Sequence, residues 1–223
     1  MPPDPLIELE GITFAYKGRP PVLRGVDFRV EDGERVALVG YNGSGKTTAL
    51  SVIMGLLRPS SGVVRIFGKE RVKERDFQEV RPLMGFVFQD SDDQLFCPTV
   101  EDDIAFGPLN MGLDQAEALK VVSEVLERLD IADFAKRVTH DLSGGEKRLV
   151  ALGTALALRP RMLILDEPTT YLDKNVTERF IAILDELDLP FLVVSHDLGF
   201  LKRTKCRYVE MVAGVVKDSD GNF

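Results

Sequence analysis

The chain has 223 residues, of which 44% are hydrophobic and 29% are charged, and its formal net charge is −8. This length can bury a substantial core, and the composition is ordinary for a globular protein in water. The acidic balance disfavours nonspecific binding to nucleic acid, because that binding depends on Lys and Arg contacts to phosphates. The two cysteines, Cys97 and Cys206, form neither a metal-spaced pair nor a disulfide framework, so we expect reduced thiols.

Nothing in the sequence predicts a membrane span or a secretory signal. The longest apolar stretch, residues 149–158, is shorter than the ~20 residues that a helix needs to cross a bilayer. Residues 1–5 carry no basic region followed by an apolar core, so they are not expected to be a signal peptide. If the protein works at a membrane, we expect it to dock on another subunit.

The first part of the chain predicts strands followed by a helix. Residues 6–16 alternate in polarity as a strand does, and the inward side chains are expected to be Ile7, Leu9, Ile12 and Phe14. Further strands are predicted at residues 22–30, 35–39 and 63–68, and a helix at residues 47–57. Hairpin strands before a parallel-type unit indicate a mixed sheet.

The second part predicts a helical segment inserted into an α/β sheet. A strand at residues 85–88 ends before Gln89, and residues 99–141 shift towards helix, with Asp114 as the N-cap of a helix over 114–130. After it we predict, in chain order, a helix to about 158, a strand at 161–165, a helix at 176–187, a strand at 191–194 and a hairpin at 207–217. We therefore expect one continuous domain with a helical subdomain inside it.

Residues 40–47 read Gly-Tyr-Asn-Gly-Ser-Gly-Lys-Thr, the pattern of a phosphate-binding loop. An apolar strand precedes them and a helix follows, as the chemistry requires. Glycines let the backbone turn tightly and direct N–H groups at phosphate oxygens, and the helix dipole faces the same anion. Lys46 is expected to reach the β- and γ-phosphates, and the Thr47 hydroxyl to bind Mg²⁺. A glycine-rich turn that binds nothing would not explain this agreement of strand, loop and helix.

Asp166 and Glu167 close the very apolar strand predicted just before them. In a chain with a phosphate loop, this is where a second contact to Mg²⁺ belongs. Asp166 is expected to hold the metal through water, and Glu167 to accept a proton from the attacking water. The alternative for adjacent acids is a solvated turn.

Residues 142–146, Leu-Ser-Gly-Gly-Glu, indicate on their own only a helix that starts at a glycine turn. Together with the two phosphate motifs they resemble the nucleotide-binding domain of ATP-binding-cassette (ABC) proteins over essentially the whole chain. In this resemblance residues 142–146 are the family signature, 40–47 the Walker A loop and 162–167 the Walker B strand. It implies the P-loop NTPase fold of ABC ATPases, an α/β fold with a mixed sheet core, N-terminal antiparallel strands and an inserted helical subdomain. The implied boundaries are a RecA-like core at about 1–90 and 160–223 and a helical subdomain at about 91–159, within a single domain 1–223.

The resemblance also assigns roles to single residues. Gln89 matches the Q-loop and His196 the switch histidine, so both join Glu167 as catalytic residues. The implied Mg²⁺ ligands are Thr47, Gln89 and Asp166. The implied ATP contacts are Tyr16, whose ring would stack on adenine, with Gly40, Tyr41, Asn42, Gly43, Ser44, Gly45, Lys46, Thr47, Thr48, Ser143, Gly144, Gly145 and Asp173. Taken singly, an aromatic or a histidine at a strand end is more often structural.

The resemblance implies a mechanism in which two such domains pair head to tail, as a homodimer or with a paralogous ATPase. Each ATP then lies between the phosphate loop of one chain and Ser143 and Gly145 of the other. ATP binds the closed pair better than the open pair, and hydrolysis lets the pair open.

Residues 88–96 and 99–108 resemble the ATPases of energy-coupling-factor importers, above all those for cobalt or nickel. This resemblance implies a transmembrane T-type subunit docked near residues 89–106, substrate-binding membrane subunits, and a peripheral position on the cytoplasmic face of the cell membrane. Leu95, Phe96, Ile104 and Phe106 are the expected apolar anchors of this docking surface. A solvated acidic loop would explain the clustered carboxylates equally well.

Two features depart from that importer type. Its ATPases often carry a carboxyl-terminal extension that helps dimerisation, whereas this sequence ends soon after the last hairpin, so we expect a weaker pair without membrane partners. Tyr171 stands where a small residue is common in the D-loop.

The transported substrate, whether cobalt, nickel or a vitamin, is not encoded in this chain. The alternatives are the ATPase of another ABC importer or exporter, a soluble ABC protein acting on DNA or ribosomes, and a P-loop kinase or GTPase. The acidic composition argues against nucleic acid as a partner, and the absence of an Asn-Lys-x-Asp motif argues against a GTPase.

Overall fold

The computed structural model describes residues 4–218, which divide into two compact units. Unit 1 contains the residues up to Arg81 and those from Pro190 onwards, and unit 2 contains residues 82–189. Residues 1–3, which belong to the segment 1–5 examined for a signal peptide, lie outside the described part. Residues 219–223, the end of the predicted domain 1–223, lie outside it as well. No helix of residues 4–218 is both long and apolar enough to cross a bilayer.

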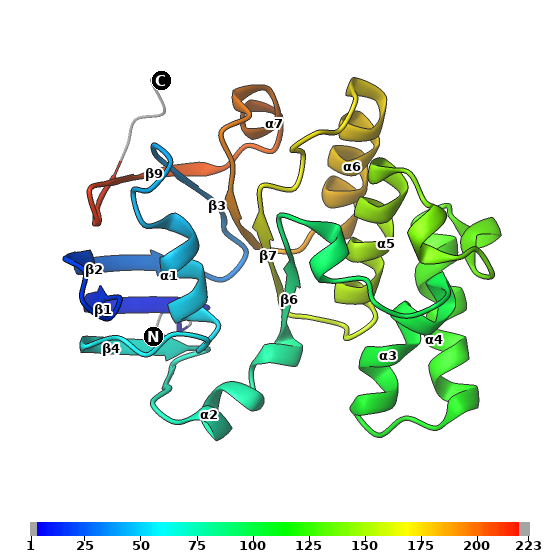
Figure 1. Ribbon diagram of the computed structural model, residues 1–223, viewed down its shortest axis with the longest axis horizontal. Coiled ribbons are helices and arrows are strands. Elements are labelled where there is room, and N and C mark those ends of the chain that lie inside the picture. Colours follow the sequence, from blue (N-terminus) through cyan, green and yellow to red (C-terminus); the bar gives the residue numbers. More distant parts are fainter. Residues whose placement is uncertain (1–3, 219–223) are drawn as a thin grey trace. The chain divides into compact units, whose positions relative to one another are not determined.

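Unit 1 begins with an antiparallel sheet in the order β2-β1-β4-β5 (Figure 1). Its strands are β1 (Ile7–Ala15), β2 (Pro21–Val30), β4 (Ser61–Ile66) and β5 (Lys69–Glu70). The four side chains predicted to point inward from β1 are all buried. They fall at 7 and 9 and then at 12 and 14, so the alternation slips by one residue. The pairing of β1 shifts register between Leu9 and Ile12, where Gly11 has a φ of 59°.

The parallel part of unit 1 centres on β3 (Arg35–Val39). It pairs in parallel with β8 (Phe191–Val194) on one side and β9 (Arg207–Val212) on the other, and β10 (Val215–Asp218) is antiparallel to β9. This unit therefore contains a mixed sheet, as predicted. Its helices are α1 (Lys46–Ile53), which lies against β2 and β4, and the short α2 (Glu74–Gln78) and α7 (Leu198–Arg203) (Figure 1).

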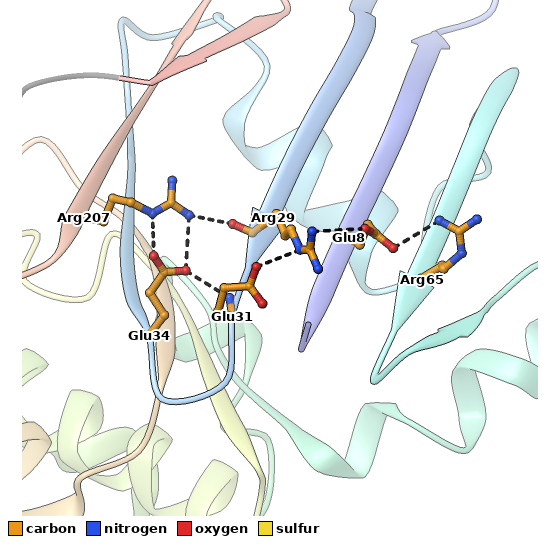
Figure 2. Close-up of polar contacts among 6 residues, drawn as sticks. All are labelled: Glu8, Arg29, Glu31, Glu34, Arg65 and Arg207. Atoms are coloured by element: carbon orange, nitrogen blue, oxygen red, sulfur yellow. Dashed lines mark hydrogen bonds and ion pairs between the residues drawn. The ribbon is translucent and has the colours of Figure 1, made fainter. Parts of the chain in front are cut away.

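A chain of charged contacts fixes the turn that leads into β3 (Figure 2). Arg207 donates to the Glu34 carboxylate and, at 2.7 Å, to the Arg29 carbonyl. Glu34 also accepts from the Glu31 amide at 3.0 Å, and Arg29 pairs with Glu31 at 2.8 Å. Burial raises the pKa of Glu34, but the hydrogen bonds from Arg207 and the Glu31 amide outweigh it and leave that pKa below its ordinary value. The turn that leads into β3 is thus tied to β2 and β9 by ion pairs and hydrogen bonds.

Unit 2 combines a parallel pair of strands with helices. The strands are β6 (Met84–Val87) and β7 (Met162–Asp166), and all five residues of β7 are buried. The helices are α3 (Val100–Asn110), α4 (Gln115–Arg128), α5 (Gly144–Leu156) and α6 (Lys174–Leu187). Short 3₁₀ turns occur at η1 (Arg81–Leu83), η2 (Ser91–Asp93), η3 (Ala132–Phe134) and η4 (Thr139–Asp141). Asp114 caps α4 as predicted, in a capping box with Glu117.

Two kinds of difference from the predicted elements have physical causes. Helix α1 ends at Ile53 rather than near residue 57, because Gly55 adopts a φ of 69° and ends the helix. The helices α2 and α7 were not predicted, since five or six residues are too few to display a helical period.

Candidate functional site

In unit 1 the phosphate loop joins β3 to α1 through glycines that no other residue could replace easily. Gly40, Gly43 and Gly45 have φ values of 143°, 79° and 114°, in the region that side chains disfavour. A Cβ on Gly40 would lie 2.3 Å from the backbone oxygen of Met211, so that position also lacks room for a side chain. The loop is therefore held close against β9, and its conformation depends on glycine.

The start of α1 is open to an anion. No side chain caps the helix at Gly45, and its first turn has no acidic residue. Lys46 is buried and donates to the carbonyls of Gly40 at 2.7 Å and Tyr41 at 3.1 Å. The Ser44 hydroxyl is buried without a hydrogen-bond partner among the described residues. An orphaned hydroxyl beside a positive amine and free helix N–H groups fits a bound phosphate.

The predicted ATP contacts of unit 1 differ in exposure. Lys46, Ser44, Gly45 and Thr48 are buried, which suits groups that hold the loop or the helix start. Gly40 is half-buried, and the remaining loop positions face solvent: Tyr41, Asn42, Gly43 and Thr47.

Tyr16 lies beside the start of α1. Its hydroxyl is 3.3 Å from Thr48 Oγ1, its ring stands edge-on to Phe14 at 5.0 Å, and 42% of the residue is exposed. An aromatic ring anchored at one edge with a free face is suited to stacking on a planar ligand. The structure thus brings Tyr16 to the phosphate-loop helix from 32 residues earlier in the chain.

His196 lies at the same edge of the parallel strands as the phosphate loop. Leu38 of β3 pairs with Val194 of β8, so Gly40 and His196 each follow this pair by two residues. Parallel strands end at one edge of a sheet, so both residues lie at that edge. His196 is exposed, and Asp197 after it caps α7 by accepting from the Phe200 amide at 3.0 Å.

Unit 2 repeats this arrangement with the acidic residues. Val87 of β6 pairs in parallel with Leu165 of β7, so Gln89 and Glu167 each follow that pair by two residues. Gln89 is exposed, whereas Asp166 and Glu167 are 5% and 8% exposed. Glu167 has a φ of 46°, an uncommon conformation for a residue other than glycine. A buried acid held in a strained backbone at a strand end is typical of functional sites.

The signature forms the start of α5 and stays accessible. Ser143 caps the helix by accepting from the Glu146 amide at 3.3 Å, while its own amide donates to Glu146 at 2.7 Å. Ser143 and Gly144 are exposed, and a Cβ added to Gly144 would meet no atom within 4 Å. Residues 143 and 144 can therefore face a second molecule.

The other side of the signature packs against α6. A Cβ on Gly145 would lie 3.0 Å from Val176 Cγ2, and Asp173 caps α6 by accepting from the Val176 amide at 3.0 Å. The signature and the D-loop residue Asp173 therefore lie next to each other in unit 2. Tyr171 in this loop is fully exposed with a φ of 64°.

Glu146 anchors the signature through Arg137. Their side chains form an ion pair at 2.6 Å, and Glu146 keeps its bonds with Ser143. The hydrogen bond from Arg137, followed by that from the Ser143 amide, lowers the pKa of Glu146 from 4.5 to about 2. The carboxylate is therefore ionised at neutral pH.

Replacing Arg137 by Met should lower the melting temperature at pH 7 by roughly 2–4 °C, a small effect because the pair is partly exposed. The folded pKa of Glu146 is depressed, so its contribution to stability is present above about pH 4.5 and is lost as the pH falls towards about 2. Urea unfolding curves should therefore show that the difference in free energy of unfolding between the wild type and Arg137→Met shrinks as the pH falls from about 4.5 towards about 2. Arg159→Met, which breaks the exposed pair with Glu124, is the control and should show a smaller difference.

The acidic segment after Gln89 corrects two expectations. Leu95 and Ile104 are 2% and 0% exposed, so they belong to the core and cannot anchor a partner. Asp103 is buried too, and its carboxylate accepts from the Phe96 and Cys97 amides and from the Thr139 hydroxyl at 2.9–3.0 Å. Phe96 and Phe106 are exposed as expected, and their rings meet edge to face at 4.8 Å.

The comparisons decide the family. The family model described as ABC transporter matches residues 23–170 of the sequence. The chain belongs to this family. A putative ABC transporter ATP-binding protein of Nitratidesulfovibrio vulgaris is 45% identical over 214 residues, which are 96% of this chain and 78% of that protein. The chain is thus an ABC ATPase, the ATP-binding subunit of a transporter.

Two further similarities are more specific. The energy-coupling factor transporter ATP-binding protein EcfA of Methanothermobacter thermautotrophicus is 42% identical over 203 residues, and this ABC ATPase spans 65% of its length. The structure of cbiO1 from Clostridium perfringens, described as part of the ABC transporter complex cbiONQ, has a TM-score of 0.86 with 33% identity and covers 96% of this chain and 87% of that one.

A dimeric ATP-binding cassette bound to ADP and phosphate has a TM-score of 0.85 with 26% identity, over 95% of this chain and 98% of that one. These similarities agree with the predicted fold of an ABC ATPase.

Sequence reasoning missed the residues that hold this site of the ABC ATPase in shape. Arg137 is joined to Glu146 by a contact that no motif marks. Arg148, buried at 4% exposure in α5, was also missed. A charged residue on the apolar face of a predicted helix was the one available signal for Arg148.

Proposed function

We propose that the chain is the ATP-hydrolysing subunit of an importer of the energy-coupling-factor type. The similarity to EcfA and to cbiO1 supports this proposal, as does an exposed aromatic surface just after Gln89. Alternatives within the family are the ATPase of another importer or exporter.

Each unit carries residues that we assign to ATP and Mg²⁺. Lys46 and the loop amides bind the phosphates, His196 bonds the γ-phosphate or water, and Tyr16 stacks on adenine. Thr47, Gln89 and Asp166 would hold Mg²⁺, which would neutralise phosphate charge. Glu167 accepts the proton of the attacking water. The orphaned Ser44 hydroxyl and the buried acids 166 and 167 support these assignments.

A second chain, either a copy of this one or a paralogue, completes the site with Ser143, Gly144, Gly145 and Asp173. The exposure of the first two residues supports this role, as do the dimeric cassettes among the similar structures. Because ATP then touches both chains, it favours the closed pair, and hydrolysis removes that preference.

The membrane partner docks on exposed aromatic side chains of residues 88–106, which are Phe88 and the contacting pair Phe96 and Phe106. These side chains are 39%, 61% and 46% exposed, and exposed carboxylates of Asp90, Asp92, Asp93 and Asp102 belong to the same segment. Aromatic anchors with an acidic rim suit a partner helix that carries apolar and basic side chains. We assign this helix to a T-type transmembrane subunit, which would hold the ATPase on the cytoplasmic face of the membrane.

Co-expression with a T-type transmembrane subunit tests this function. Phe96→Asp should reduce co-purification of the T-type subunit about tenfold or more, since it places a charge in an apolar contact. Leu119→Asp, at another exposed apolar position of unit 2, should leave it unchanged. If the wild type and Phe96→Asp co-purify equal amounts of the T-type subunit, the proposed docking surface is wrong. Reconstituted vesicles that take up cobalt, nickel or a vitamin would identify the substrate.

A further inference from the structure

Helix α5 holds the segment 88–94 with polar contacts from one side. Lys147 pairs with Asp92 at 2.6 Å, and Arg148 donates to the backbone carbonyls of Phe88 and, at 2.7 Å, Gln89. Gln94 donates to the Ala151 carbonyl at 2.9 Å and to the Thr154 hydroxyl at 2.8 Å. Positions 147, 148, 151 and 154 follow the spacing of one helix face. The segment that contains Gln89 is therefore fastened to the helix that begins at the signature.

Among these residues, Arg148 is the one whose burial is expected to cost free energy of folding. It is 4% exposed, and burial lowers the pKa of its guanidinium although the charges of Asp90 and Asp166 oppose that effect. Its Nε has no hydrogen-bond partner among residues 4–218. A buried cation with an unsatisfied donor destabilises a fold unless its remaining contacts compensate for the lost hydration.

Those contacts are specific to the Gln89 peptide. Gln94 already closes the segment, because its Oε1 accepts from the Phe88 amide at 3.0 Å and its Nε2 reaches the Phe86 carbonyl at 3.2 Å. Arg148 adds bonds to two successive carbonyls, which belong to the peptide groups on either side of the Gln89 Cα. Two donors of one planar guanidinium fix the orientation of that backbone, which a single amine could not do.

We propose that Arg148 is a positioning residue for Gln89. It fixes the backbone of Gln89, whose side chain would hold Mg²⁺, and it links that backbone to the helix capped by Ser143. Gln89 and the signature helix therefore move together. The proposal rests on the assignment of Gln89 to Mg²⁺ made above.

Arg148→Lys tests it in the purified full chain, because it keeps the positive charge but replaces the two donor nitrogens of a planar guanidinium with one nitrogen. The Mg²⁺ concentration for half-maximal turnover at saturating ATP should rise about tenfold, the cost of one charge-assisted hydrogen bond. Hydrogen exchange in a peptide covering 86–94 should become faster without nucleotide. Arg179→Lys is the matched control, since Arg179 also binds two successive carbonyls, those of Leu129 and Asp130, at 2.8 and 2.7 Å. It should leave both readouts unchanged.

The double variant separates positioning from general stability. If Arg148 acts through Gln89, adding Arg148→Lys to Gln89→Ala should not raise the Mg²⁺ requirement further. If the double variant multiplies the increases in Mg²⁺ requirement of the two single variants, the proposal is wrong. It is also wrong if Arg148→Lys has a normal Mg²⁺ requirement while that of Gln89→Ala is raised. A normal Mg²⁺ dependence in Gln89→Ala would instead overturn the assignment of Gln89 and this proposal with it. If Arg148→Lys does not fold, Arg148→Gln carries the same test.

Discussion

Replacing Glu167 by Gln should lower ATP turnover by roughly 10²–10⁴ while ATP still binds, because an amide cannot accept the proton of the attacking water. The side chain is suited to that role because it is 8% exposed and follows a strand that is entirely buried. Gln has nearly the same shape, so the packing around residue 167 should persist. Steady-state phosphate release gives the turnover, and calorimetric titration with Mg-ATP gives the affinity.

Glu186→Gln is the control for this experiment, since Glu186 is exposed on α6 and the change removes the same charge. Its turnover should equal that of the wild type. Normal turnover in Glu167→Gln would take the proton-accepting role away from Glu167. Loss of ATP binding in that variant would assign the residue to ligand binding or to structure.

The sequence predicted the strands and the residues that follow them well, for a physical reason. A parallel strand buried on both faces must be apolar throughout, so β7 and β8 stand out in the sequence and end where polar residues begin. The residues after such strands meet at one edge. The pairs Leu38–Val194 and Val87–Leu165 put His196 and Gln89 level with Gly40 and Glu167.

The exposure of single side chains could not be predicted in the same way. Leu95 and Phe96 are neighbours in an irregular segment, and only the packing of the rest of unit 2 decides which of them is buried. The same holds for Ile104 and Phe106 in α3, where the apolar face depends on the helices that cover it. All four side chains are apolar and were therefore expected to contact a partner subunit. Leu95 and Ile104 instead pack in the core.

Long-range polar contacts were beyond the sequence for a further reason. Arg148 reaches carbonyls 59 and 60 residues earlier, and Arg207 reaches Glu34 over 173 residues. Backbone carbonyls have no residue type, so no motif marks the partner of Arg148. These arginines nevertheless decide how rigidly the Gln89 segment and the turn before β3 are held.

Replacing Gly144 by Arg should abolish the ATP-dependent pair of chains without unfolding the single chain. A Cβ at residue 144 meets no atom within 4 Å, and its backbone does not require glycine. Arg also favours helix over Gly by about 1 kcal/mol. In the proposed pair, however, residue 144 faces the nucleotide held by the partner, and a long cationic side chain leaves no room for that contact. Turnover should fall by roughly 10²-fold or more, about 3 kcal/mol in the barrier.

Light scattering in the Glu167→Gln background, where ATP is expected to be hydrolysed slowly, measures the pair directly. Gln115→Arg is the matched control, because Gln115 is the exposed first residue of α4 and follows a capping box like that of α5. It should pair with ATP as the parent does. Binding of Mg-ATP to the single chain should survive in both variants, since the phosphate loop is untouched. An ATP-dependent dimer of Gly144→Arg equal to that of the parent would mean that the signature does not face a second molecule.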